Sequence, residues 1–149
     1  KASRDPAGKQ YFWHMLVGHN FSENEFNKLL DAQHQGLKVE RNRNDFIQLL
    51  SSCYLSFSQA GYNTMMDLLI TNTPAVVVPF EGVAERAQII RARAFEALGI
   101  TKIIRERDLN SETLLSTLEQ VSKSTKDPLK INLNGAARLA EIIEHKLSI

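Results

Sequence analysis

The stretch YLSFSQAGYNTMMDLLI, residues 54–70, passes directly from a strand pattern to a helix pattern. The apolar run Cys53–Phe57 is typical of a buried strand, and Gly61 is expected to open a helix that continues to about Thr71. Small and polar residues fill the junction between the two. In an open parallel sheet, ligands bind at the carboxyl ends of the strands. The stretch therefore predicts an α/β fold with a ligand site at this junction.

The same alternation of strand and helix patterns extends in both directions. Further strands are expected at Tyr11–Val17, Leu37–Glu40, Ala75–Phe80 and Thr101–Ile104. Helix starts are expected at Ser22 (with Glu25 in a capping box), at Asn44 or Asp45, at about Ala84, at Ser111 and at Asn134. Gly99 is placed to end the helix that begins near Ala84. This order predicts a Rossmann-like three-layer α/β sandwich whose sheet is mostly parallel and covered on both faces.

Composition narrows the class of protein. The chain of 149 residues fits one domain, with residues 1–10 (KASRDPAGKQ) interpreted as a linker and residues 11–149 as the domain. Because the chain begins with Lys1, we expect a further part of the protein to precede it. A net charge of +1 argues against a nucleic-acid binder held by bulk electrostatics. No apolar run reaches the roughly 18 residues of a membrane span, and the single cysteine excludes an internal disulfide.

Three residues at the junction favour binding of an anion. Gly61 would let a ligand approach the backbone, because it has no Cβ. The first N–H groups of the following helix have no partner within the helix, and the helix dipole makes this end positive. Asn63 and Thr64 add side-chain donors, so phosphate is the expected ligand. The alternative, that Gly61 only makes the turn and Thr64 only caps the helix, is equally compatible with the motif.

Two further residues extend the predicted site beyond a phosphate. Asp67 follows Thr64 by three residues on a helix that is apolar nearly all round, where a carboxylate needs a partner such as a ribose diol. The alternatives are an Asp67 that pairs with a nearby lysine or arginine, or one that reaches solvent. Gln88 follows the strand Ala75–Phe80, where its amide is placed to bond sugar hydroxyls. The basic residues of the same segment, Arg86, Arg91 and Arg93, are interpreted as a solvated helix face.

The remaining candidate groups are weaker. Gly18 and His19 follow the first strand at the same predicted edge. His19 is interpreted as a plain loop residue, with a hydrogen bond to a phosphate as the alternative. His14 is expected to be structural, and His34 and His145 to lie on helix surfaces. No two histidines have the spacing of metal ligands, so we expect no metal site and no cofactor.

Taken together, these motifs resemble the C-terminal half of a GT-B glycosyltransferase. SQAGYNTMMDLLITNTPAVVVPF, then Gln88–Ala92 and Leu98-Gly99, are similar to family 28, which includes the peptidoglycan N-acetylglucosaminyltransferase. The resemblance implies a nucleotide-sugar donor, usually a UDP-sugar, and assigns binding roles along the chain. The nucleotide base would contact the backbone of the loop formed by Arg43, Asn44 and Asp45, and the pyrophosphate would contact Gly61, Asn63 and Thr64. Asp67 would bind the ribose and Gln88 the donor sugar. Gly18 would lie in the loop that faces the cleft. The chain departs from the pattern at Gly18-His19-Asn20, Cys53 and Ala87.

The function expected from this resemblance is sugar transfer from a nucleotide-sugar, with the acceptor site and catalytic base in an N-terminal domain that this chain lacks. Alternatives are a donor-binding subunit or degenerate module that needs a separate partner chain, and a nucleotide-sugar epimerase or hydrolase on the same fold. We expect a cytoplasmic protein. The sequence does not decide whether the protein also associates peripherally with the inner face of the membrane. The sugar, the acceptor, the base, the stereochemistry and the oligomeric state are not determined by the sequence.

Overall fold

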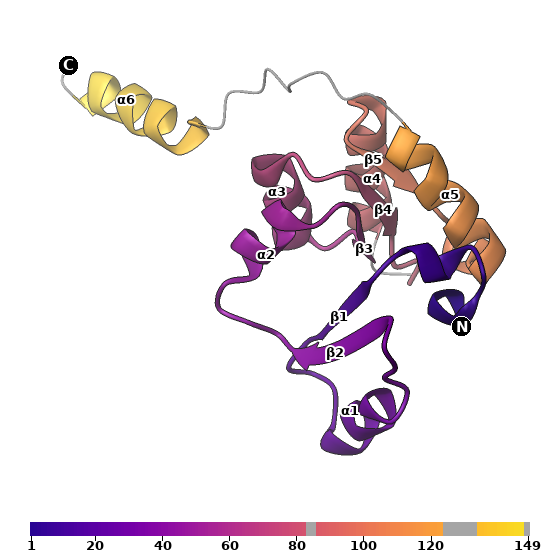
Figure 1. The fold of residues 1–149 in the computed structure, drawn as a ribbon. Coiled ribbons are helices and arrows are strands. Elements are labelled where there is room, and N and C mark those ends of the chain that lie inside the picture. Colours follow the sequence, from indigo (N-terminus) through magenta and orange to yellow (C-terminus); the bar gives the residue numbers. More distant parts are fainter. Residues whose placement is uncertain (83–85, 124–133, 148–149) are drawn as a thin grey trace.

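The computed structural model describes residues 1–82, 86–123 and 134–147 (Figure 1). The strands are β1 (Trp13–Val17), β2 (Leu37–Arg41), β3 (Ser56–Gln59), β4 (Ala75–Val78) and β5 (Thr101–Ile103). The helices are α1 (Glu23–Leu30), α2 (Phe46–Ser52), α3 (Tyr62–Thr71), α4 (Arg86–Ala97), α5 (Ser111–Lys123) and α6 (Gly135–Leu147). Short 3-10 helices are η1 (Ala2–Arg4), η2 (Gly8–Gln10) and η3 (Glu106–Asp108). The predicted α/β alternation is confirmed.

All strand pairings between these elements are parallel, as predicted, but the strands form two sheets rather than one. β1 pairs with β2, and β3, β4 and β5 form a second sheet in that order. Figure 1 shows β1 and β2 beside α1, apart from the three-stranded sheet. The two sheets approach each other where Trp13 and Leu55 pack against the same apolar cluster beneath α5.

The three-stranded sheet is the centre of a three-layer sandwich, because β4 is apolar on both faces. Ala75 and Val77 pack into one cluster with residues of α2, α3 and α4, among them Met65 and Phe95. Val76 and Val78 pack on the opposite face against α5. All four β4 side chains are buried, which is expected for a central parallel strand.

Two helix ends follow the sequence signals. Ser22 and Glu25 form the predicted capping box at α1: the Ser22 Oγ accepts from the Glu25 N–H, and the Glu25 carboxylate accepts from the Ser22 N–H. After α4, Gly99 has φ +71°, a left-handed conformation that glycine adopts without a steric penalty.

Other boundaries correct the sequence interpretation. The third strand begins at Ser56, and Cys53 is the C-cap of α2 rather than a strand residue. The Asp45 side chain does not cap α2, because it pairs with Arg43 instead. At α5, the Asn110 Oδ1 accepts from the Thr113 N–H at 2.9 Å, so the side-chain cap is Asn110 and not Ser111. The predicted start of α4 at Ala84 lies outside the described residues.

Residues 1–10 pack against the domain. Gly8 is buried, and a Cβ there would lie 1.8 Å from the Ala2 carbonyl oxygen. The Trp13 indole donates to the Gly8 carbonyl at 2.9 Å. Ser3 is also buried and shares a 3.0 Å hydrogen bond with His34, which lies in a β-bridge between α1 and β2 rather than on a helix surface. The division of the chain at residue 10 stays a prediction.

Candidate functional site

The β3–α3 junction has the geometry of an open helix N-terminus. Gly61 is the N-cap residue, with φ −61° and ψ 150°, and no side chain caps the helix. A Cβ placed on Gly61 would have one neighbour within 4 Å, the Thr64 Oγ1 at 3.9 Å. The Gly61 carbonyl accepts from the Met65 N–H, so the regular helical hydrogen bonds begin there. The three preceding N–H groups, of residues 62–64, therefore remain available to an anion at the N-terminus.

The side chains of α3 divide between the core and this open end. Met65 and Leu68 are fully buried and anchor the helix against β4 and α2. Asn63 is exposed, and Thr64 and Asp67 are half-buried. Asp67 lies three residues after Thr64, so the two side chains are neighbours on the helix surface. The Asp67 carboxylate is thus about one turn away from the open N–H groups.

Gln88 reaches back to the end of β4. Its Oε1 accepts from the Phe80 N–H at 3.0 Å, two residues beyond the strand. This hydrogen bond holds the side-chain amide at the carboxyl end of the sheet, the edge on which Gly61 also lies. The structure therefore places Gly61 and Gln88 at the same edge of the three-stranded sheet, with Asn63, Thr64 and Asp67 in the first two turns of α3.

Arg91 was missed by the sequence interpretation. It is half-buried, and its Nη1 donates to the Ala60 carbonyl oxygen at 2.8 Å. Its guanidinium lies 5.3 Å from the centroid of the Tyr62 ring. The interpretation of Arg91 as part of a solvated face is wrong, whereas Arg86 and Arg93 are exposed. Local sequence gives no signal for this contact, because residues 60 and 91 are far apart along the chain.

An ion pair joins the loops that follow β4 and β5 at the same edge. Arg105 donates through Nε and Nη2 to the Glu81 carboxylate, and the Nη2–Oε2 distance is 2.6 Å. The Glu81 carboxylate also accepts from the Glu106 N–H. The Arg105 side chain holds the pKa of Glu81 below its usual value. This bidentate pair fixes the loops that follow the two strands.

Arg43 and Asn44 lie in the loop after β2, in the other sheet. Arg43 pairs with both carboxylate oxygens of Asp45, at 2.7 and 2.6 Å, and with Glu40. Glu40 also contacts Lys38 and His14, and these hydrogen bonds, that of Lys38 first, lower the pKa of Glu40 to about 2. The network fixes the side chain of Arg43, while Asn44 is exposed.

Gly18 follows β1 in the same two-stranded sheet, and a Cβ there would have no neighbour within 4 Å. No hydrogen bond or ion pair between described residues joins Gly18, Arg43 or Asn44 to the group around Gly61. Gly61, Asn63, Thr64 and Asp67 thus lie at the start of α3, and Gln88 is bonded to the loop after β4, whereas Gly18, Arg43 and Asn44 follow strands of the separate sheet. The binding roles of these residues stay predictions.

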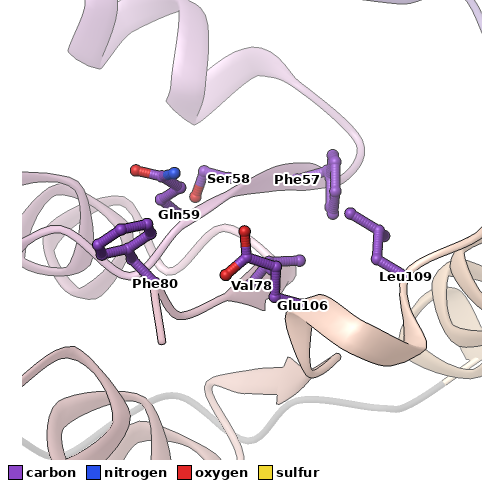
Figure 2. A pocket seen from close by; sticks show the side chains of 7 residues that line it. All are labelled: Phe57, Ser58, Gln59, Val78, Phe80, Glu106 and Leu109. Atoms are coloured by element: carbon purple, nitrogen blue, oxygen red, sulfur yellow. The ribbon is translucent and has the colours of Figure 1, made fainter. Parts of the chain in front are cut away.

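A pocket of about 260 Å³ lies beside the ends of β3 and β4 (Figure 2). Its lining comprises Phe57, Ser58, Gln59, Val78, Phe80, Glu106 and Leu109. Phe57 and Phe80 are each exposed by about two-fifths. None of the predicted site residues lines this pocket. The sequence does contain a signal for it, because Phe57 and Gln59 alternate along the third strand and so share one face of the sheet.

The described residues contain neither a candidate metal site nor a candidate membrane-spanning helix. No group of three or more His, Cys, Asp or Glu side chains in residues 1–82, 86–123 and 134–147 is placed to hold a metal ion. A metal-independent site stays a prediction. In the same ranges, no helix combines the length and the apolar character needed to cross a membrane.

The sequence matches the family model described as glycosyltransferase family 28 C-terminal domain over residues 5–145. The chain is 30% identical over 96 residues to the UDP-N-acetylglucosamine–N-acetylmuramyl-(pentapeptide) pyrophosphoryl-undecaprenol N-acetylglucosamine transferase of Clostridium novyi (strain NT), covering 64% of the chain and 27% of that protein. It is 31% identical over 124 residues to the transferase of the same description from Clostridium perfringens (strain 13 / Type A), covering 78% of the chain and 34% of that protein.

A solved structure supports the fold. The structure titled as the glycotransferase of kitacinnamycin matches with a TM-score of 0.58 at 18% identity, covering 75% of this chain and 27% of that one. The predicted Rossmann-like half of a GT-B fold is therefore confirmed. The chain spans only about a quarter to a third of these relatives, at 27% and 34% of the two transferases.

Proposed function

The chain belongs to the glycosyltransferase family 28 C-terminal domains, and from this premise we propose that it binds the nucleotide-sugar donor of a hexosyltransferase. The donor is a UDP-sugar. The observation that carries the proposal is the uncapped N-terminus of α3 at Gly61, with Asp67 one turn further on. The two transferases described above have UDP-N-acetylglucosamine in their names, which supports this choice of donor.

Each part of the donor has a matching group in the proposed site. The diphosphate accepts hydrogen bonds from the first-turn N–H groups of α3 and from the Asn63 and Thr64 side chains. The Asp67 carboxylate accepts from the ribose hydroxyls, and Gln88 contacts the sugar. As the acceptor oxygen bonds to the anomeric carbon of the sugar, the bond from that carbon to the β-phosphate oxygen breaks, and negative charge develops on the leaving diphosphate. The helix N-terminus stabilises that charge through fixed dipoles, without a metal ion.

The acceptor and the catalytic base are proposed to come from a second domain or a partner chain. The chain spans 27% and 34% of the two transferases, which supports this division of labour. Their names give an undecaprenol-linked acceptor, which is a lipid. We therefore propose that the complete protein works in the cytoplasm, at the inner face of the membrane.

The role of Asp67 is tested by removing either partner of the proposed ribose contact. We expect the unsubstituted chain to bind UDP more tightly than 2′-deoxy-UDP. In Asp67→Asn, affinity for UDP should fall about tenfold, because the ribose hydroxyls then face a neutral amide in place of the charged carboxylate acceptor. The preference for UDP over 2′-deoxy-UDP should fall with it. Isothermal titration with both nucleotides measures these changes, and an undiminished preference in Asp67→Asn would exclude the ribose role.

A further inference from the structure

Arg91 connects α4 to the turn that opens α3. Its guanidinium donates to the carbonyl of Ala60, the fully buried residue just before Gly61. It also lies over the ring of Tyr62, the residue just after Gly61. The one side chain therefore contacts both neighbours of the glycine at the helix N-terminus. A conformational shift of this turn would have to break the hydrogen bond and the ring contact together.

Gln88 and Arg91 each bond to the backbone of a loop at the sheet edge. They are three residues apart on α4 and so lie on the same face of that helix. Gln88 accepts from the backbone of Phe80, which follows β4, and Arg91 donates to the backbone of Ala60, which follows β3. The face of α4 that presents these two side chains thus holds the loops after both strands.

The charge of Arg91 is unusual for its position. The N-terminus of a helix is the positive end of its dipole, where a cation is unfavourable and an anion is favourable. The first turn of α3 contains no acidic residue. Within the described ranges, Arg91 also forms no ion pair with a carboxylate. The positive end of α3 and the positive guanidinium therefore repel one another. A bound anion would interact favourably with both and offset this repulsion.

We propose that Arg91 recognises the diphosphate of the donor and positions the β3–α3 turn that receives it. This inference rests on the proposed function, because it assigns one more residue to the same site. Arginine suits the role, since its planar guanidinium has five N–H donors and Nη1 alone is engaged by Ala60. Its remaining donors match the geometry of phosphate oxygens.

The test compares Arg91→Ala with Arg93→Ala. Arg93 is an exposed arginine on the same helix, so its removal changes the net charge equally. We expect Arg91→Ala to weaken binding of UDP about tenfold or more, as for a lost charged hydrogen bond. Binding of uridine, which has no phosphate, should change less than about twofold because the lost contact is to phosphate. Arg93→Ala should bind both compounds as the unsubstituted chain does.

Salt separates recognition of charge from a purely structural role. The difference in UDP affinity between Arg91→Ala and the unsubstituted chain should shrink as the salt concentration rises, since screening weakens charge interactions. Arg91→Met, which keeps the aliphatic stem over Tyr62, serves if Arg91→Ala does not fold. Circular dichroism verifies the fold of each variant.

The outcomes distinguish the inference from the proposed function. If Arg91→Ala or Arg91→Met binds UDP like the unsubstituted chain, the inference is overturned and the proposed function stands. An equal loss of uridine and UDP affinity also overturns it, because the role of Arg91 would then be structural. If the unsubstituted chain does not bind UDP, the proposed function fails and the inference fails with it.

Discussion

Replacing Gly61 with aspartate is expected to stabilise the fold and to weaken UDP binding strongly. Aspartate is a preferred N-cap residue, and Gly61 has φ −61° and ψ 150°, a conformation open to any residue. The added Cβ would meet only the Thr64 Oγ1 at 3.9 Å. Capping and the interaction with the helix dipole together should add a few tenths to about 1 kcal/mol of stability.

The same carboxylate would occupy the place proposed for the diphosphate. Its hydrogen bonds to the first-turn N–H groups and its negative charge both oppose the ligand. Like charges placed together cost several kcal/mol, so affinity for UDP should fall by about a hundredfold or more. Titration with UDP and urea unfolding of the same sample measure the two effects, which have opposite signs.

Gly61→Ser is the matched control for charge. Serine also caps a helix and adds a side chain of similar size, but it brings no negative charge. We expect a similar gain in stability with a much smaller loss of UDP affinity. If Gly61→Asp is folded, more stable and still binds UDP like the unsubstituted chain, the diphosphate does not bind at this helix N-terminus.

The largest expected effect on stability is that of Leu68→Ala. Leu68 is fully buried and packs with Leu50, Met65 and Phe95 between the sheet and the helices. Truncation of a buried leucine removes apolar burial and leaves a cavity, at a cost of about 2–5 kcal/mol. Since domains of this kind are stabilised by about 5–15 kcal/mol in total, a substantial fraction of the molecules could unfold.

Ile70→Ala is the control on the same helix. Ile70 is 57% exposed, so its removal should change the free energy of unfolding by no more than about 0.5 kcal/mol. Urea unfolding followed by circular dichroism compares the two variants. Equal stability of Leu68→Ala and Ile70→Ala would contradict the packing of α3 described above.

Much of the fold could be predicted because its signals are local. Ala75–Val78 are apolar at every position, which indicates a strand buried on both faces. Gly61 and Gly99 mark the start and end of helices, as observed. The apolar residues Cys53 and Leu55 predict an earlier start for the third strand than the structure has. In the structure, Tyr54 is 67% exposed and the chain enters β3 only at Ser56.

The candidate site was less accessible to sequence reasoning, because its contacts join distant segments. Asp67 and Thr64 are neighbours on one helix, so their spacing indicates their proximity. The hydrogen bond from Arg91 to Ala60 depends on how α4 packs against the sheet, and no local pattern encodes that packing. The sequence also does not predict that β1 and β3 belong to different sheets. Each strand has an ordinary apolar pattern, and the choice of neighbouring strand depends on tertiary packing.

The most direct test of donor binding at α3 is an NMR titration of the chain with UDP, GDP, ADP and dTDP. The account predicts a preference for UDP, with the largest chemical-shift changes at Gly61, Asn63, Thr64 and Asp67. Smaller changes should appear at Gln88 and Arg91. Binding of UDP that leaves the α3 N-terminus unperturbed would contradict the site, and the absence of any shifts at millimolar nucleotide would contradict donor binding by this chain.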